Sequence, residues 1–320
     1  MEQQIQKRYV IGVDGGGTKT EAALADFKGK ILRVVKAGPS NLRNVGINKA
    51  VFNISEAIKK VKQGKKITSI FIGLAAVEEE FKFEKEKIKK EIRKRLKNFK
   101  GKLEIGSDQI VAFRSGTDEK NGIILIAGTG AVCHGWKNGK EAKTSGWGWL
   151  DDEGSGFWIG QKGFQAIFKE LDGRGEKTLI TKLVFENWRL KDKKDFLKKV
   201  YVQDSVRQVS LISRIVDEAA RKRDKIAKNI MLEAGEELFL TAKRVIEKLN
   251  FKNEEFPIVL IGRVFESEIV LKIVKIEIKK IVPRAKFLIP QPKVEPVIGA
   301  VKLAIENLPS SREISLLGLD

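Results

Sequence analysis

The sequence predicts an α/β protein made of two halves that share one order of strands and helices. Short apolar segments of strand length alternate with longer amphipathic segments, a pattern typical of α/β folds. The order βββαβαβ runs from Tyr9 to Gly106 and begins again at Gly122. In both halves a glycine-rich turn joins the first two strands, at residues 14–20 and 128–130.

The strands and helices of the first half are predicted from apolar runs that are separated by turn residues. Its strands are expected at 9–13, 21–26, 31–36, 69–74 and 102–106, and its first helix at 47–61. A second, lysine-rich helix is expected to end near residue 99, because apolar side chains recur at helical spacing and form one buried face. That face consists of Phe81, Ile88, Ile92, Leu96 and Phe99.

The second half repeats this order with a helical insertion. Strands are expected at 123–127, 131–136, 141–144, 258–261 and 286–289, and helices at most of 156–249, from about 266, and at 297–307. Segments 37–44 and 290–296 are expected to be loops because of their Gly, Pro and Asn residues. We therefore expect two domains, residues 1–116 and 117–320, and leave open whether the last helix packs back onto the first domain.

The composition excludes several classes of active site. The 320 residues include one cysteine, Cys133, and one histidine, His134. A single cysteine forms neither an internal disulfide nor a thiolate metal cage, and a single histidine excludes His-rich zinc sites and most Ser-His or Cys-His nucleophiles. Because neighbouring side chains of a strand point to opposite faces, both residues are interpreted as structural.

The net charge of +20, from 62 basic and 42 acidic residues, raises the question of a polyanionic partner. The densest basic stretch is the solvated face of the predicted lysine-rich helix. Other basic residues are scattered, without the interleaved aromatic side chains that stack on bases, so no nucleic-acid partner is expected. The polar N-terminus and the short apolar runs predict no signal peptide and no membrane span. We expect a soluble, cytoplasmic protein.

The glycine-rich turn at 14–20 is a candidate phosphate site. It joins two strands, whereas the P-loop and the Rossmann fingerprint both open a helix. Consecutive glycines let backbone N–H groups approach an anion, Thr20 adds a hydroxyl, and an aspartate suits a magnesium ion. The alternatives are a flexible turn without a ligand and a lysine that is merely solvated. The candidate phosphate and metal ligands are Asp14, Gly15, Gly16, Gly17, Thr18 and Lys19.

The segment 12–20, Gly-Val-Asp-Gly-Gly-Gly-Thr-Lys-Thr, resembles the first phosphate motif of the superfamily of acetate kinase, sugar kinases, heat-shock chaperone ATPases and actin. More narrowly it resembles the BadF/BadG/BcrA/BcrD ATPase family, which includes N-acetylglucosamine kinases and related archaeal hexokinases. The resemblance spans almost the whole chain, and it is the joint order of the motifs that is specific. The other matching segments are 38–41, 106–108, 126–130, 146–156, 260–264 and 296–300.

This resemblance implies a fold and a cofactor. The fold would be two ribonuclease-H-like domains, as in actin-like ATPases, with ATP bound in the cleft between them and domain closure on binding. Asp14 would lie near Mg²⁺, and Gly262 would lie near the adenosine. The second domain would contact the phosphates through Gly128, Thr129 and Gly130.

The resemblance also implies a sugar kinase that acts on a hexose or an N-acetylhexosamine, with N-acetylglucosamine as the first expectation. Asp108 would be the catalytic base, although an aspartate after a strand is often a cap or turn residue. Asp152 would contact the sugar or instead cap the helix that follows it, and Glu153 is a weaker candidate. The other expected sugar contacts are Asn41, Gly146 and Trp147. Whether the protein forms a homodimer stays open.

The sequence departs from the family pattern in two places, and three other functions compete with a sugar kinase. The spacing from Trp147 to Asp152 is one residue shorter than is usual in the family, and Arg263 replaces a glycine near the adenosine, where it either stacks on the base or faces water. A nucleotide- or sugar-binding regulator without turnover is the main alternative. A nucleic-acid binder would show affinity that falls steeply with salt. An activator of 2-hydroxyacyl-CoA dehydratases is not expected, because a single cysteine cannot ligate its iron–sulfur cluster.

Overall fold

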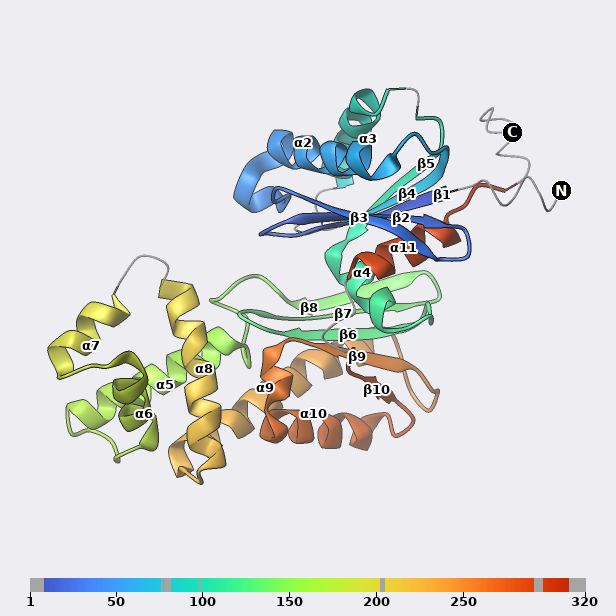
Figure 1. Cartoon of the computed structure of the whole chain (residues 1–320). Helices are drawn as coiled ribbons and strands as arrows, with labels where there is room; N and C mark the ends of the chain where they lie inside the picture. The colour runs from blue at the N-terminus through green and yellow to red at the C-terminus, as the bar shows by residue number, and fades with distance from the viewer. Residues whose placement is uncertain are drawn as a thin grey trace. The chain divides into compact units, whose positions relative to one another are not determined.

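The computed structural model describes residues 9–75, 77, 82–97, 99–201, 205–290 and 296–310. The chain divides into two compact units. Unit 1 comprises Met1–Asp118 together with Pro290–Asp320, and unit 2 comprises Glu119–Ile289. Each unit contains one five-stranded sheet with helices packed against it (Figure 1). The mixed α/β architecture with two similar sheets confirms the predicted fold class.

In unit 1 the strands lie in the order β3-β2-β1-β4-β5. β1 pairs antiparallel with β2 and parallel with β4, and β2–β3 and β4–β5 extend the sheet antiparallel and parallel, respectively. The apolar run of β1 fits its central place, because a strand that is covered on both faces needs apolar side chains throughout. The elements are β1 (Tyr9–Gly15), β2 (Thr20–Asp26), β3 (Ile31–Ala37), α2 (Leu42–Lys62), β4 (Ile67–Leu74), α3 (Lys82–Arg95), β5 (Lys102–Ser107), α4 (Asp108–Gly116) and α11 (Val297–Glu306).

Helices cover both faces of the unit 1 sheet (Figure 1). One apolar core joins the sheet to α2 and α3, and a second joins it to α4 and α11. Two glycines let α11 approach closely. A Cβ atom on Gly12 of β1 would lie 2.4 Å from the Val301 nitrogen, and one on Gly299 would lie 1.9 Å from the Val111 carbonyl oxygen of α4.

In unit 2 the strands lie in the order β10-β9-β6-β7-β8. β6, β7 and β8 pair antiparallel, while β9 and β10 run parallel to β6. This is the pairing of unit 1 again, so the predicted repetition is confirmed. The elements are β6 (Gly122–Ala127), β7 (Ala131–Lys137), β8 (Lys140–Ser145), α5 (Gly156–Leu171), α6 (Leu179–Trp188), α7 (Lys193–Val200), α8 (Ser205–Arg221), α9 (Lys225–Lys248), β9 (Pro257–Ile261), the 3₁₀ helix η2 (Arg263–Glu266), α10 (Glu268–Ile281) and β10 (Lys286–Leu288).

The fold differs from the sequence prediction in four places. The lysine-rich helix ends at Arg95 and not near residue 99. The first helix begins at Leu42 and contains a break at Gly46, whose φ is 71°. Helix α4 directly follows β5 and was not predicted. The expected second domain, 117–320, is wrong at its C-terminal end, because residues from Pro290 onward belong to unit 1. Their helix, α11, packs on β1 and α4 through the two close glycine contacts.

Two expectations fall partly outside the described residues. Phe81, the first residue of the predicted apolar helix face, and most of the expected loop at 290–296 are not described. Within the part of the chain that is described, no helix combines the length and the apolar character that crossing a membrane requires.

Candidate functional site

In unit 1 the glycine-rich turn forms the tip of the β1–β2 hairpin. The Gly16 nitrogen donates to the Lys19 carbonyl oxygen at 3.0 Å and closes the turn. The Gly16 carbonyl oxygen accepts hydrogen bonds from the backbone nitrogens of Ser40 and Asn41, at 3.0 and 3.1 Å. Gly17, Thr18 and Lys19 are exposed at the tip. The turn is therefore fixed at its base and open to a ligand at its tip.

Close packing explains one glycine of this turn. A Cβ atom on Gly15 would lie 2.6 Å from the Ser40 hydroxyl oxygen and 3.0 Å from the Gly73 carbonyl oxygen. On the same side of the hairpin, the Thr20 hydroxyl lies 2.7 Å from the Gly38 carbonyl oxygen and 2.8 Å from the Ser40 hydroxyl. Thr20 is fully buried, so it anchors the turn and does not face a ligand.

Asn41 lies beside this turn, at the start of α2. Its side-chain oxygen accepts a hydrogen bond from the Arg43 nitrogen at 2.9 Å and caps the helix. Its backbone nitrogen is held by the turn itself. The structure thus brings Asn41 next to the predicted phosphate loop, while its contact with a sugar stays a prediction.

Asp14 and Asp108 lie at the carboxyl ends of two parallel strands of one sheet, Asp14 inside β1 and Asp108 just after β5. Asp14 is in register with Gly73 of β4, which is in register with Gly106 of β5. Asp108 follows two residues later as the first residue of α4, with Ser107 as the helix cap. A side chain on Gly73 would collide with Val111, so this glycine lets α4 lie close over β4. Both carboxylates therefore reach the same edge of the sheet.

The environment of Asp14 disfavours its charge. Burial, followed by the nearby carboxylates of Asp108 and Glu21, raises the pKa of Asp14 from 3.8 to about 6, and Lys19 opposes this shift. Burial and like charges both destabilise an ionised carboxylate. A cation placed beside Asp14 would relieve both effects, which fits the magnesium role predicted for this residue.

Glu21 is a charged residue of this site that our sequence analysis missed. It lies in β2 opposite Asp14 and is only 1% exposed. Its carboxylate oxygen Oε1 lies 2.7 Å from the Lys19 ammonium nitrogen and 3.3 Å from that of Lys36. A signal was present, because Glu21 is the one charged residue in the run 20–25, Thr-Glu-Ala-Ala-Leu-Ala.

In unit 2 the predicted turn at 128–130 packs against the start of α5. The Gly128 nitrogen donates to the Gly130 carbonyl oxygen at 2.9 Å. The Gly128 carbonyl oxygen accepts from the Gly156 nitrogen at 2.7 Å, and the Thr129 carbonyl oxygen accepts from the Phe157 nitrogen at 3.1 Å. The exposed Thr129 is thus held at the N-terminal end of a helix, where the partial positive charge favours anions.

Asp152 organises the loop that precedes α5. Its Oδ1 atom accepts hydrogen bonds from the backbone nitrogens of Gly146 and Gly148, at 3.0 and 3.3 Å, and lies 3.4 Å from the Ser145 hydroxyl. Burial is the main cause that raises its pKa. The cap of α5 is Ser155 and not Asp152, so that alternative is wrong. Asp152 holds the loop, and its contact with a sugar stays a prediction.

The same loop exposes aromatic and acidic side chains. Trp147 is 62% exposed, and the Lys143 ammonium nitrogen lies 5.8 Å from the centre of its ring. Glu153 faces Glu237, and burial together with Glu153 raises the pKa of Glu237. The exposed ring of Trp147 is accessible to a ligand, while its contact with a sugar stays a prediction, and Glu153 faces another carboxyl group.

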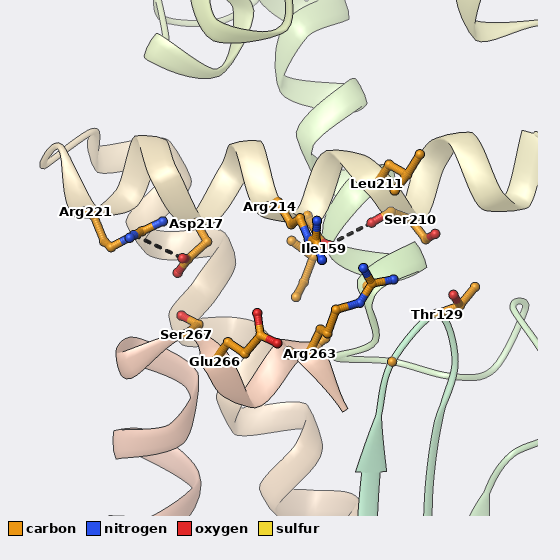
Figure 2. A pocket seen from close by; sticks show the side chains of 14 residues that line it. Thr129, Ile159, Ser210, Leu211, Arg214, Asp217, Arg221, Arg263, Glu266 and Ser267 are labelled. Carbon is orange, nitrogen blue, oxygen red and sulfur yellow. Dashed lines mark hydrogen bonds and ion pairs between the residues drawn. The ribbon is translucent and has the colours of Figure 1, made fainter. Parts of the chain in front are cut away.

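A hollow of about 270 Å³ lies in unit 2 beside the turn at 128–130. Figure 2 shows Thr129 at one end, Asp217 and Ser267 at the other, and Arg263 between them. Gly262 precedes the segment 263–267, which forms part of the wall of the hollow. Only glycine fits at position 262, because its φ is 117° and a Cβ atom there would lie 2.1 Å from the Ala127 carbonyl oxygen. The residues that line the hollow are Gly128, Thr129, Gly156, Ile159, Ser210, Leu211, Ser213, Arg214, Asp217, Arg221, Arg263, Val264, Glu266 and Ser267.

The far wall of the hollow contains polar residues that no sequence motif marked. Asp217 pairs with Arg221 through Oδ2, at 3.1 Å. Its other oxygen, Oδ1, and the Ser267 hydroxyl oxygen are buried and have no hydrogen-bond partner among the described residues. Because buried polar atoms are normally hydrogen-bonded, these two oxygens indicate that a polar ligand or water completes the wall.

The described residues offer no self-sufficient metal site. No group of three or more His, Cys, Asp or Glu side chains in the described ranges is arranged to hold a metal ion. Magnesium at nucleotide sites is commonly held by one or two carboxylates, with phosphate oxygens and water as the other ligands. A single carboxylate such as Asp14 is compatible with that arrangement.

Two proteins named as sugar kinases resemble this chain in sequence. An N-acetylmuramic acid/N-acetylglucosamine kinase from Clostridium acetobutylicum is 34% identical over 268 residues, which cover 81% of this chain and 86% of that protein. An N-acetyl-D-glucosamine kinase from Dictyostelium discoideum is 31% identical over 325 residues, which cover 95% and 99%. Both similarities extend over most of each chain.

Two solved structures show the same fold. A candidate N-acetylglucosamine kinase from Chromobacterium violaceum aligns with a TM-score of 0.68 at 24% identity, over 94% of this chain and 99% of that one. A ROK family glucokinase from Streptomyces griseus, solved with glucose and AMPPNP, aligns with a TM-score of 0.56 at 17% identity, over 93% and 99%. The sequence profile of one family matches residues 11–304. This protein belongs to the BadF/BadG/BcrA/BcrD ATPase family.

Proposed function

We propose that this protein is a kinase that transfers the γ-phosphoryl group of ATP to a hydroxyl of an N-acetylhexosamine, with N-acetylglucosamine as the expected acceptor. The observation that carries the proposal is the pair of carboxylates, Asp14 and Asp108, at one edge of a sheet beside a glycine-rich phosphate loop. The proposal is supported by two relatives named as N-acetylglucosamine kinases, which are 34% and 31% identical to this chain.

The nucleotide is assigned to the two glycine-rich turns and to the hollow of unit 2. Backbone N–H groups of the turn at 14–20 are expected to bind phosphate oxygens. Thr129, in the turn that packs against the start of α5, is expected to do the same. The adenosine is expected in the hollow of about 270 Å³, with the Arg263 guanidinium on the base. Such donors stabilise the charge that spreads over phosphate oxygens during transfer.

Asp14 is assigned to the magnesium ion, held directly or through water. Magnesium bound there with ATP would neutralise part of the phosphate charge. Asp14 suits this task because its buried carboxylate lies close to two other acidic side chains. The ion would complete its ligands with phosphate oxygens and water.

Asp108 is assigned as the base that accepts the proton of the sugar hydroxyl. It is the first residue of α4, so the positive end of that helix favours its negative charge. Phosphoryl transfer depends mainly on positioning and charge stabilisation, so the base has to orient one hydroxyl and take its proton. Asn41, Gly146 and Trp147 are the proposed sugar contacts, and Asp152 holds the loop that contains two of them.

A coupled ADP-release assay over a panel of sugars tests this function. The panel would contain N-acetylglucosamine, N-acetylmuramic acid, glucosamine, glucose and mannose. We expect turnover that depends on Mg-ATP and is fastest with an N-acetylated sugar. If ATP binds but no sugar stimulates ADP release, the kinase proposal is wrong and a regulator without turnover takes its place.

A further inference from the structure

We propose that Glu21 is a positioning residue that holds the Lys19 ammonium group beside the phosphate loop, where it contacts a phosphate oxygen of the nucleotide during transfer. The inference rests on the proposed kinase function and adds a residue that no motif of the sequence indicated. It also decides between the two interpretations of Lys19, as a phosphate ligand or as a merely solvated lysine.

The hairpin places these charged side chains on one face of the sheet. Glu21 is the cross-strand neighbour of Asp14 on β1 and of Lys36 on β3. Directly opposite residues of adjacent strands share a face. Lys19 lies in the turn just before β2, and its ammonium group reaches the same side because it pairs with Glu21. Thr20, between Lys19 and Glu21, points to the other face, where it contacts Gly38 and Ser40.

Burial makes Glu21 an anchor for Lys19. The Glu21 side chain is 2% exposed, whereas that of Lys19 is 48% exposed, and the two charged groups lie 2.7 Å apart. The buried side chain has little freedom to move, so a lysine at this distance is confined. Its exposed side remains accessible to a ligand at the tip of the hairpin. A lysine that is only solvated would lose side-chain entropy in such a pair without any gain in function.

The cost of burying this carboxylate also argues for a function. Taking an ion out of water is expensive, and an apolar side chain of similar volume is often at least as stabilising as a buried ion pair. The next four residues of β2 are the apolar residues 22–25, all of them buried. Glu21 further places a negative charge close to Asp14, which disfavours the ionised form of Asp14. Stability alone therefore does not account for a glutamate at this position.

The negative charge of Glu21 predicts how its replacement would change KM and kcat. Glu21 is itself negative, so replacing it with glutamine removes a repulsive charge from the neighbourhood of an anionic nucleotide. We therefore expect Glu21→Gln to leave the KM for ATP unchanged or lower, while kcat falls about tenfold because Lys19 is no longer confined. General structural damage would instead raise KM as well as lower kcat.

A double-mutant cycle tests whether Glu21 acts through Lys19. The variants are Glu21→Gln, Lys19→Met and the two combined, assayed with the best sugar of the panel. We expect the double variant to have the kcat of Lys19→Met alone, because Glu21 has nothing left to position. Multiplicative losses of kcat would overturn the proposal.

Lys36→Met is the matched control. Lys36 pairs with the same carboxylate oxygen at 3.3 Å but belongs to β3 and not to the β1–β2 hairpin that carries the phosphate loop. We expect a kcat within about twofold of wild type. A loss equal to that of Glu21→Gln would mean that the whole ion cluster is structural, which would also overturn the proposal.

Crystal structures with Mg-AMPPNP test the same inference without requiring turnover. In the wild-type complex we expect the Lys19 ammonium group to contact both the Glu21 carboxylate and a phosphate oxygen, and in Glu21→Gln we expect it to leave that position. Failure of the kinase function would appear as absent turnover with this contact present. Failure of the inference would appear as a Lys19 side chain that points to solvent in an active enzyme.

Discussion

The Arg114 guanidinium of α4 forms a two-pronged ion pair with the Glu306 carboxylate of α11, across 192 residues of sequence. Nη1 donates to Oε2 at 3.0 Å, and Nη2 forms a shorter contact with Oε1. The Arg114 side chain is only 4% exposed, and Nη2 also donates to the Asp118 carbonyl oxygen at 3.1 Å. This pair joins the last helix of unit 1 to the last helix before unit 2.

Removing one partner of this pair is expected to destabilise unit 1. Glu306→Ala leaves the Arg114 charge buried and uncompensated, and such changes cost on the order of 3 kcal/mol of unfolding free energy. Replacing both residues with leucine should recover most of that loss, because no charge is left buried. Urea unfolding of the three proteins measures this. A Glu306→Ala variant as stable as wild type would contradict it.

Asp108→Asn is expected to abolish most sugar phosphorylation while ATP still binds. Asparagine keeps the shape of the side chain but cannot accept a proton, and loss of a positioned base lowers rates by about 10²- to 10⁴-fold. The measurements are kcat from coupled ADP release and the dissociation constant of Mg-ATP from calorimetry. A wild-type kcat would show that Asp108 is not the base.

The raised pKa of Asp14 predicts that the stability of the protein without nucleotide depends on pH. Its pKa is raised from 3.8 to about 6 in the folded state, so folding favours the protonated carboxyl group. Its contribution to the free energy of unfolding is full below about pH 4 and is lost as the pH rises through 6. The difference between the two pKa values corresponds to roughly 3 kcal/mol at neutral pH.

Asp14→Asn removes this dependence. We expect the variant to be more stable than wild type at pH 8, with the advantage shrinking as the pH is lowered toward 4. Urea unfolding across this range, without nucleotide or magnesium, measures the difference. An advantage that stays constant with pH would show that Asp14 does not titrate in this range.

The two glycines that flank Thr129 are expected to tolerate substitution very differently. A Cβ atom on Gly130 would lie 2.3 Å from Asp152 Oδ2, whereas nothing lies within 4 Å of one on Gly128. The loop hydrogen bonds hold Asp152 in place, so Gly130→Ala should cost about 1–3 kcal/mol of stability and weaken ATP binding. Gly128→Ala is the control, and thermal unfolding with and without Mg-ATP compares the two. Equal effects would contradict this account of the turn.

The repeated sheets could be predicted because their central strands leave a clear pattern. β1 and β6 are almost wholly buried, so they read as continuous apolar runs bounded by glycine turns. Helix α4 was missed because it begins at Asp108, directly after β5, without a separating loop. The packing of α11 on Gly12 is a long-range contact, and such contacts are not encoded in local periodicity.

The two glycine-rich turns of the candidate site could also be predicted from a local sequence pattern. The residues of the turns at 14–20 and 128–130 are contiguous, so motifs reveal them. The far wall of the hollow is built from α8 and from the segment 263–267, and no spacing connects Asp217 with Ser267. Glu21 stood out in its strand, but its function depends on cross-strand pairing with Asp14 and Lys36, which requires the register.

The return of the chain to unit 1 has a consequence for biosynthesis. Unit 2 is continuous in sequence, whereas unit 1 lacks its last helix until α11 has been translated. At about 5–20 residues per second, translation of the intervening segment takes roughly 10–30 s. During that interval the sheet face around Gly12, which α11 later covers, is open on the ribosome. The nascent chain therefore completes its second unit before its first.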